Sequence, residues 1–322
     1  MSESPAIGID IGGTNTKFGL VDLNGELLDF DQIPTPNSPP DTSVAIICDE
    51  LMEFLEYSDF QPNSISSVGI GFPGIILQPE GKIIAAPNLK GWGNVDLHQV
   101  FAEKLEADVL IDNDANLAAL AEYKWGAGKG MDPLVLFTLG TGVGGGIIIG
   151  GKIFHGFSGA AAELGHQTIE MNGRVCNCGN RGCLESIAGS SGVAKIAWEF
   201  LNKDKGSLLW ELMDGDYGSL DAAMVGEAAT RGDPSSLKIA GIVARAIGVG
   251  VANIMNILNP ECILLAGGMT EWGKDLLLKP VIDEARKRAF KLHFGSCPID
   301  FATWGIKAGV VGAAALTFDN AL

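Results

Sequence analysis

The sequence predicts an α/β protein with two related domains, and three observations lead to this prediction. The length of 322 residues exceeds the usual size of one domain. Apolar residues make up 47% of the chain and charged residues 19%, which is enough apolar material for a buried core. A unit of strand, glycine-rich turn and strand near the N-terminus recurs about 130 residues later. We therefore expect a duplicated α/β domain whose two turns face one cleft.

Apolar periodicity predicts the individual elements. Apolar runs bounded by Gly, Pro, Asn or Asp predict strands, and apolar residues three or four positions apart predict helices. The expected strands are Ala6–Gly12, Lys17–Val21, Leu27–Ile33, Ser67–Phe72, Asp108–Ile111, Leu134–Leu139, Gly144–Ile149 and Ile263–Ala266. The expected helices are Asp41–Tyr57, Ala115–Trp125, Ile187–Leu201, Leu220–Arg231, Pro234–Leu258 and Ala308–Phe318. The sequence suggests no function for a Pro-rich loop over residues 34–40 or for an acidic region over residues 214–221.

Glycine and charge are the outliers of the composition. The 44 glycines show no collagen-like period and accompany a large apolar fraction, so they mark places where the backbone needs them. Lys and Arg total 22 against 39 Asp and Glu, and the net charge of −17 argues against binding to nucleic acid or to an anionic membrane. The N-terminus shows no signal-peptide pattern and glycines or polar residues interrupt the apolar runs, so we expect a cytoplasmic protein.

The first glycine turn follows the first strand, in the run Asp10-Ile-Gly12-Gly13-Thr14-Asn-Thr-Lys17. Glycine lets several backbone N–H groups approach phosphate oxygens, and the Thr14 hydroxyl adds a donor. Asp10 at the strand end is placed to hold a divalent cation directly or through water. A plain Gly-Gly hairpin explains the same residues, and the run matches neither a Walker A loop nor a dinucleotide-binding GxGxxG motif.

Two further glycine runs, Gly140-Thr141-Gly142 and Gly267-Gly268, follow later strands. Two similar hairpins are harder to explain as structure alone, so we favour two phosphate-binding turns. The glycines at 267 and 268 would let an adenosine lie against the backbone, although an ordinary strand-to-helix turn has the same pattern. Since Lys17 is the only basic residue in either hairpin turn, we expect backbone N–H groups and Mg²⁺ to neutralise the phosphates of the ligand.

The run Asp112-Asn113-Asp114 lies where a strand is expected to pass into a helix. A carboxylate there can accept the proton of a hydroxyl during phosphoryl transfer, in which positioning matters more than basicity. Asn and Asp are also preferred helix caps, and capping explains the run by itself. Both interpretations can hold, with Asn113 or Asp112 as the cap and Asp114 directed into the cleft.

Three cysteines, Cys176, Cys178 and Cys183, lie within eight residues, and His166 precedes them. One His and three Cys suit tetrahedral Zn²⁺, and without an export signal metal ligation is favoured over a disulfide or buried free thiols. Four protein ligands leave no position for water, so the site would be structural. Carboxylates that flank this segment could accept hydrogen bonds from sugar hydroxyls, or could be plain surface acids. They are Glu163 and Glu185.

Together these runs resemble the ROK sugar kinases, a family named for repressor, open reading frame and kinase. DIGGTNTKFGLVD, GIGFPG, APNLKGW, IDNDANLAALAE, LGTGVGGGI, AELGH and CNCGNRGCLE occur in the family's order, from about Ala6 to beyond Gly268. The resemblance implies a two-domain actin/hexokinase-like (ribonuclease H-like) α/β fold with an interdomain cleft. We expect a small domain over 1–116, completed by the C-terminal helix at 306–322, and a large domain over 117–305 that carries the zinc loop.

The resemblance is strongest to ATP-dependent members that phosphorylate glucose at its 6-hydroxyl, and by it Asp114 is the general base. One ring nitrogen of His166 would bind zinc and the other would donate to a sugar hydroxyl. The implied sugar contacts are Gly74, Asn88, Asn113, Asp114, Glu163, His166 and Glu185. The implied ATP contacts are Gly12–Thr14, Gly140–Gly142 and Gly267-Gly268. The implied zinc ligands are His166, Cys176, Cys178 and Cys183.

Other functions stay open from the sequence. The family also includes DNA-binding repressors, but the first hairpin begins at Ile7, which leaves no room for a preceding helix-turn-helix, and the net charge opposes DNA. A zinc-ribbon interaction module explains the cysteines but neither glycine hairpin. Among kinases, the alternative substrates are N-acetylglucosamine, N-acetylmannosamine, mannose and fructose, and polyphosphate is an alternative donor. Because members of this family commonly form dimers or tetramers, the resemblance leads us to expect a homodimer.

Overall fold

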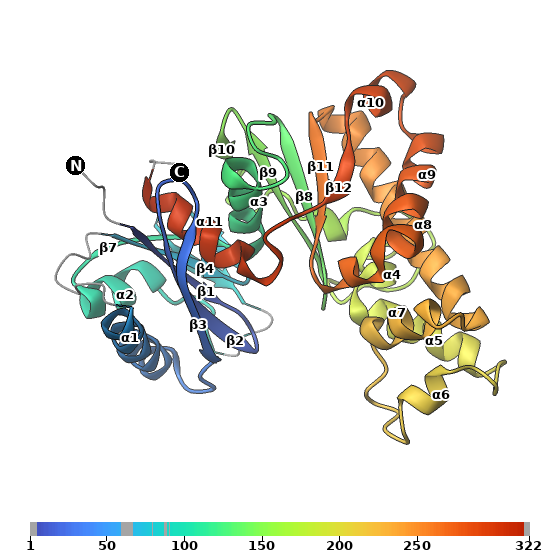
Figure 1. Cartoon of the computed structure of the whole chain (residues 1–322), viewed down its shortest axis with the longest axis horizontal. Helices are drawn as coiled ribbons and strands as arrows, with labels where there is room; N and C mark the ends of the chain where they lie inside the picture. Colours follow the sequence, from blue (N-terminus) through green and yellow to red (C-terminus); the bar gives the residue numbers. More distant parts are fainter. Residues whose placement is uncertain (1–4, 59–66, 79, 87–88, 90, 319–322) are drawn as a thin grey trace. The chain divides into compact units, whose positions relative to one another are not determined.

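The computed structural model describes residues 5–58, 67–78, 80–86, 89 and 91–318 (Figure 1). The chain divides into two compact units. Unit 1 comprises Met1–Gly130, Gly146–Ala162 and Ile306–Leu322, and unit 2 comprises Met131–Gly145 and Glu163–Gly305. This division differs from the expected boundary at residue 116. The helix that begins at Asp114 packs against the C-terminal helix, so that its whole length belongs to unit 1.

A five-stranded sheet in the order β3-β2-β1-β4-β7 forms the centre of unit 1. Strand β1 (Ala6–Ile11) is antiparallel to β2 (Asn15–Val21) and parallel to β4 (Ser67–Phe72). Strand β7 (Asp108–Asn113) is parallel to β4, and β3 (Leu27–Pro34) pairs with β2 at the other edge. Because β1, β4 and β7 run in the same direction, their carboxyl ends lie at one edge of the sheet.

Helices cover both faces of this sheet. Among the described residues, the helices of unit 1 are α1 (Pro40–Tyr57), α2 (Leu97–Leu105), α3 (Asp114–Trp125) and α11 (Ala308–Phe318). Helix α11 lies so close to β1 and β4 that a Cβ at Gly8 would come within 2.0 Å of the Val310 carbonyl oxygen, and one at Gly69 within 1.8 Å of that of Ala313. Ile7 and neighbouring apolar side chains of the sheet join the core cluster to which α1 contributes. Glycine is therefore required where α11 meets the sheet.

The second sheet has the order β10-β9-β8-β11-β12. It contains β8 (Leu134–Leu139), β9 (Val143–Ile149), β10 (Lys152–Ile153), β11 (Cys262–Ala266) and β12 (Ile299–Phe301). Strand β11 is parallel to both β8 and β12, and β9 is antiparallel to β10. As in the first sheet, a glycine turn joins two neighbouring strands, β8 and β9, next to a parallel pair, so the repeated sequence pattern corresponds to a repeated arrangement of strands.

The long helix α8 is the central helix of unit 2. The helices of this unit are α4 (Glu185–Ala188), α5 (Ser190–Leu201), α6 (Leu209–Leu212), α7 (Ala222–Thr230), α8 (Pro234–Leu258), α9 (Lys279–Arg288) and α10 (Lys291–Ser296). Helix α8 is long and apolar enough to cross a membrane by length and composition, but 56% of its most apolar window is buried inside the protein, as in a core helix. It packs on α5, α7 and α9.

The structure corrects one expected helix and adds short elements. Residues 187–201 do not form one helix, because Gly189 adopts an extended conformation (φ −72°, ψ 153°) that separates α4 from α5. Elements that the sequence does not predict are β10, β12, α2, α6, α9, α10 and the small hairpin of β5 (Ile75–Leu77) and β6 (Lys82–Ala85). Short helical turns also occur at Leu164–His166, Gly268–Trp272, Lys274–Leu278 and Gly305–Lys307.

Candidate active site

Two charged side chains meet at the carboxyl end of β1 in unit 1. Asp10 and Lys17 are opposite each other in the β1–β2 register, and the Lys17 Nζ lies 2.7 Å from the Asp10 Oδ2. Asp10 is buried. The ion pair explains how a carboxylate can be buried at this strand end. It also means that Lys17, expected near phosphate, is bound to Asp10 in this structure.

Asn113 is the cap of α3 and also connects that helix to a neighbouring loop. Its Oδ1 accepts hydrogen bonds from the backbone N–H groups of Ala115 (2.9 Å) and Asn116 (3.3 Å). Its Nδ2 donates to the Gly74 carbonyl oxygen at 3.0 Å. Two of the residues expected to contact sugar, Gly74 and Asn113, are thus joined directly, and the expected helix cap is confirmed as Asn113.

Asp114 is the first residue of α3 and is partly buried. The pKa of its carboxyl group is raised to about 6, first by burial and second by the nearby Asp10 carboxylate. The Ala115 N–H and the Lys17 ammonium act in the opposite direction, because both stabilise the charged form. A carboxylate with a pKa close to neutral is suited to take a proton from a hydroxyl group.

Asp112 lies beside this site and is held by three donors. Its Oδ1 accepts from the Asn113 N–H at 2.6 Å and from the Asn116 Nδ2 at 2.9 Å. Its Oδ2 lies 2.6 Å from the Nε2 of His155, in the segment that follows β10. The Asp112 side chain is 2% exposed, so these donors replace water around a buried carboxylate. His155 cannot be recognised from the sequence, because an isolated His in a loop carries no spacing pattern.

The second glycine turn, in unit 2, is fixed from the α4–α5 junction. The Glu185 Oε2 accepts a hydrogen bond from the Val143 N–H at 3.0 Å. The Ser190 N–H lies 3.1 Å from the carbonyl oxygens of both Gly140 and Thr141. A Cβ at Gly142 would come within 2.5 Å of Glu185 Oε2, so glycine allows this close approach. One oxygen of Glu185, an expected sugar contact, thus holds the turn.

Gly267 directly follows β11, beside the end of β8. Its φ is +94°, and a Cβ there would come within 2.4 Å of the Leu139 carbonyl oxygen, so both conformation and space require glycine. Ala266 pairs with Thr138 in the parallel register of β11 and β8. The sheet therefore brings Gly267-Gly268 and the turn that starts at Gly140 to the same edge.

Four expected metal ligands lie together in unit 2. One ligand atom each from His166, Cys176, Cys178 and Cys183 lies within 4.8 Å of the others. The Cys178 and Cys183 Sγ atoms are 3.7 Å apart, and the Cys176 Sγ lies 3.7 Å from the His166 Nδ1. A tetrahedral site with Zn–S bonds of about 2.3 Å has ligand atoms about 3.8 Å apart, so the spacing suits zinc.

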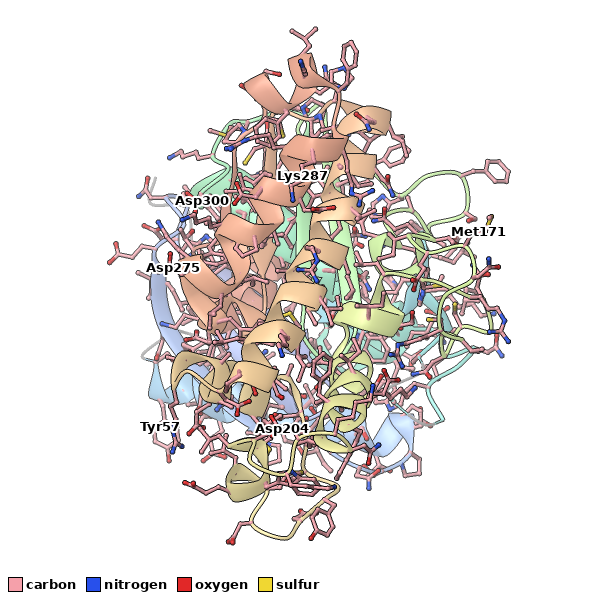
Figure 2. All side chains as sticks on the ribbon, turned by 90° about the vertical axis from the view of Figure 1, so that its right-hand side faces the viewer. Tyr57, Met171, Asp204, Asp275, Lys287 and Asp300 are labelled. Carbon is pink, nitrogen blue, oxygen red and sulfur yellow. The ribbon has the colours of Figure 1, made fainter. Side chains whose placement is uncertain are left out.

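The loop that carries the cysteines is closed by backbone contacts. The Cys176 N–H donates to the Asn180 carbonyl oxygen, and the Gly182 N–H donates to that of Arg174, each at 2.8 Å. At Gly182 the φ is +72° and a Cβ would come within 1.7 Å of the Glu170 carbonyl oxygen. Met171, which precedes this loop, is 83% exposed. Figure 2 shows its side chain at the outer surface.

His166 presents its two ring nitrogens to different groups. The Nδ1 is directed to the cysteines, whereas the Nε2 lies 3.8 Å from the Glu163 Oε2. Because Glu163 immediately precedes the helical turn that contains His166, the two residues are placed by the same short element. A metal bound at Nδ1 would leave Nε2 protonated and available to donate a hydrogen bond.

The structure thus forms two groups of candidate site residues. In unit 1 these are Asp10, the turn Gly12–Thr14, Lys17, Gly74, Asn113 and Asp114. In unit 2 they are Gly140–Gly142, Glu163, His166, Cys176, Cys178, Cys183, Glu185 and Gly267-Gly268. Asn88, another expected sugar contact, lies outside the described residues.

Comparisons with known proteins give one consistent result. A model of the ROK family matches residues 6–320. The glucokinase of Halalkalibacterium halodurans is 38% identical over 315 residues, which cover 97% of this chain and 94% of that protein. The xylose repressor of Caldicellulosiruptor bescii is 31% identical over 98% of this chain and 78% of the repressor.

Solved structures agree with the sequence relatives. A ROK family glucokinase from Streptomyces griseus, in complex with glucose and AMPPNP, is 34% identical with a TM-score of 0.83. The similarity covers 97% of this chain and 98% of that one. The likeness shows the expected actin/hexokinase-like α/β fold. The chain belongs to the ROK family.

Proposed function

We propose that this protein transfers the γ-phosphoryl group of ATP to the 6-hydroxyl of glucose. The support is similarity over nearly the whole chain to proteins named glucokinase, at 34–38% identity, one of them solved with glucose and AMPPNP. The observation in this chain that carries the proposal is Asp114. It is a partly buried carboxylate with a pKa of about 6 at the start of a capped helix.

In the proposed reaction Asp114 accepts the proton of the 6-hydroxyl while that oxygen forms a bond to the γ-phosphorus. The bond between the γ-phosphorus and the oxygen that links it to the β-phosphorus breaks, and ADP leaves. Asn113 holds the start of α3 to Gly74, which keeps the base and the proposed sugar loop in fixed relation. The remaining proposed sugar contacts are Asn88, Glu163, His166 and Glu185.

The nucleotide is proposed to bind through the backbone of the glycine turns. The turns Gly12–Thr14 and Gly140–Gly142 would offer phosphate oxygens their remaining N–H groups, since those of Gly12 and Gly140 donate to the Asn15 and Gly142 carbonyl oxygens. Gly267-Gly268 would accommodate the nucleoside. When bound, Mg²⁺ neutralises phosphate charge, and Asp10 at the end of β1 is the carboxylate that would hold it directly or through water. The Lys17 ammonium, bound to Asp10, keeps part of this acidic region neutral.

We further propose that His166, Cys176, Cys178 and Cys183 hold a structural Zn²⁺. The close spacing of the four ligand atoms and the chemistry of the donor set support this. A closed set of four protein ligands has no position for substrate, so the ion would act by fixing the loop and the His166 tautomer. The protein chain itself then presents the His166 Nε2 and the Glu163 carboxylate to the sugar.

A single assay tests the activity and the substrate together. ADP release is measured with ATP and glucose, mannose, fructose, N-acetylglucosamine or N-acetylmannosamine in turn. We expect the highest kcat/KM with glucose and no release without sugar. A preference for an N-acylhexosamine would support the alternative hexose kinase and contradict glucose specificity. No sugar-dependent release with any member of the panel would contradict the kinase function.

The location and assembly of the protein belong to the same proposal. We propose a cytoplasmic homodimer that binds neither nucleic acid nor membrane, and the net charge of −17 supports the last two points. Light scattering of the purified protein measures its mass directly. A mass of about one chain, 33.7 kDa, would contradict the dimer.

A further inference from the structure

The Pro-rich loop, residues 34–40, contacts the first glycine turn through Thr35. The Thr35 hydroxyl donates to the Gly12 carbonyl oxygen at 2.7 Å, and the Thr35 N–H donates to the Thr14 carbonyl oxygen at 2.9 Å. The Thr35 Oγ1 also lies 3.1 Å from the Oγ1 of Thr16, which is fully buried. One residue therefore holds the carbonyl groups on both sides of Gly13.

The other end of the loop is fixed to helix α1. The Ser43 N–H donates to the Pro39 carbonyl oxygen at 2.9 Å, and the buried Ser43 hydroxyl lies 3.0 Å from the Ser38 carbonyl oxygen and 3.3 Å from that of Pro36. The prolines at 34, 36, 39 and 40 restrict the backbone between these points. The loop is thus a short rigid connection between α1 and the glycine turn.

Holding the Gly12 carbonyl also fixes the direction of a donor. In a trans peptide the C=O of one residue and the N–H of the next point to opposite sides. The Gly12–Gly13 peptide is trans, so the hydrogen bond from Thr35 directs the Gly13 N–H away from the loop. Gly13 and Thr14 are exposed, and no acceptor for the Gly13 N–H occurs among the residues that the structure describes.

We propose that Thr35 is a positioning residue for nucleotide binding, because it orients the Gly13 N–H toward a phosphate oxygen of ATP. This inference rests on the proposed kinase function. Thr35 itself touches no ligand, since its hydroxyl and N–H are both used on the turn. The Pro-rich loop, which no motif explained, thereby receives a function in holding the phosphate-binding turn.

The test compares Thr35→Val, which replaces the hydroxyl group with a methyl group of similar size, with Thr35→Ser, which keeps the hydroxyl. Dissociation constants for AMPPNP with Mg²⁺ and for glucose are measured separately by calorimetry. We expect Thr35→Val to weaken AMPPNP binding about three- to tenfold, the range for loss of one hydrogen bond, and to leave glucose binding within about twofold. Thr35→Ser should bind AMPPNP like the wild type. Thr42→Val changes an exposed threonine on α1 and should alter neither constant.

A second variant covers the case in which Thr35→Val does not fold. Ser43→Ala removes the hydroxyl at the far end of the loop, and we expect it to weaken AMPPNP binding about two- to threefold with glucose binding unchanged. Wild-type affinity for AMPPNP in both variants would overturn the inference. Equal losses for AMPPNP and glucose would also overturn it, because they indicate a general structural role.

The inference and the proposed function fail in distinguishable ways. If the wild type binds AMPPNP and glucose but transfers no phosphoryl group, the kinase proposal fails while the comparison of Thr35 variants still decides the positioning role. If the wild type binds no nucleotide, both proposals are contradicted.

Discussion

The carboxyl group of Asp114 shows how one residue is tuned by its surroundings. Burial and Asp10 raise its pKa, whereas the Ala115 N–H and Lys17 lower it, with a net value of about 6. At neutral pH the group is therefore deprotonated and ready to accept a proton. It is also roughly a hundredfold more basic than an aspartate with the ordinary pKa of about 3.9.

Asp114 should set an acidic limit to activity. Below about pH 6 we expect kcat/KM for glucose to fall about tenfold per pH unit, because the protonated carboxyl cannot accept the hydroxyl proton. Asp114→Asn should lose at least about 100-fold in kcat. A pH profile of the wild type and a kinetic assay of the variant check both statements. Near-normal kcat in the variant would rule out the base.

The same variant has a stability signature. A raised folded-state pKa means that folding disfavours the charged form, so the stability contribution of Asp114 falls as pH rises above its unfolded pKa. At neutral pH the asparagine carries no such penalty. The melting temperature of Asp114→Asn should therefore equal or exceed that of the wild type, which separates lost chemistry from lost folding.

His155 gives a prediction about folding stability. His155→Phe removes one of three donors to the buried Asp112 carboxylate and should lower the free energy of unfolding by about 1–3 kcal/mol. His98→Phe, an exposed position on α2, is the matched control and should change it little. Urea unfolding compares the two. Equal stability of both variants would show that the His155–Asp112 contact contributes nothing.

The hydrogen-bond and ion-pair partners of the individual site residues were the least predictable part of the site. Asp114 and its cap Asn113 are neighbours in the chain, so the sequence alone could indicate both. Asp112 with His155, and Glu185 with Val143, are 43 and 42 residues apart and meet only through the tertiary fold. The Asp10–Lys17 pair required the register of β1 and β2, which the turn did not reveal by itself.

Among the elements, length favoured prediction without deciding it, since the helices α2 and α9, of nine and ten residues, were not predicted. Long amphipathic or continuous apolar segments such as α1, α8 and β8 carry enough periodic residues to be recognised. Two- to four-residue elements such as β10 and β5 form only because neighbouring strands pair with them. The break between α4 and α5 was missed, since helical spacing continues across Gly189 while its backbone is extended.

The cysteine loop is the element whose proposed metal can be tested directly. Cys178→Ser should reduce bound zinc from about one ion per chain to nearly none and weaken glucose binding, because His166 loses its fixed orientation. Cys178 is exposed, so the change leaves the core intact, and Asn177→Ser beside it is the control. Elemental analysis and calorimetry measure the two effects. A wild-type protein without zinc would refute the tetrahedral site.

At the scale of the whole molecule, glycine and charge are connected. The chain carries a net charge of −17, and Lys17, the basic residue of the first turn, is bound to Asp10. Under the proposed function, phosphate recognition falls to backbone N–H groups that glycine leaves accessible. The length, composition and repeated turns of the chain were enough to predict its fold class. The boundary between the units could not be predicted in this way, because it depends on the packing of α3 against α11.

The charge balance predicts an unusual response to salt. A site built on Lys and Arg loses affinity for phosphates as salt screens the attraction. Here the negative charge of the protein repels the negatively charged nucleotide, and salt screens this repulsion. The dissociation constant for AMPPNP, with Mg²⁺ in excess, should therefore stay level or fall as the KCl concentration is raised. Calorimetric titrations at several salt concentrations decide this. A steep rise of the constant would show that cationic side chains dominate binding.

The position of α11 against β1 and β4 has a consequence for biosynthesis. The strands that it covers, β1 and β4, are synthesised some 240 to 300 residues before Ala308–Phe318. Until then, the sheet face that carries Gly8 and Gly69 lacks α11, although α3 contacts this face where the Leu117 side chain lies near Gly71. The sheet of unit 1 is therefore covered by α11 only after the strands of the second sheet have been made, and until then the face that α11 covers is exposed to aggregation.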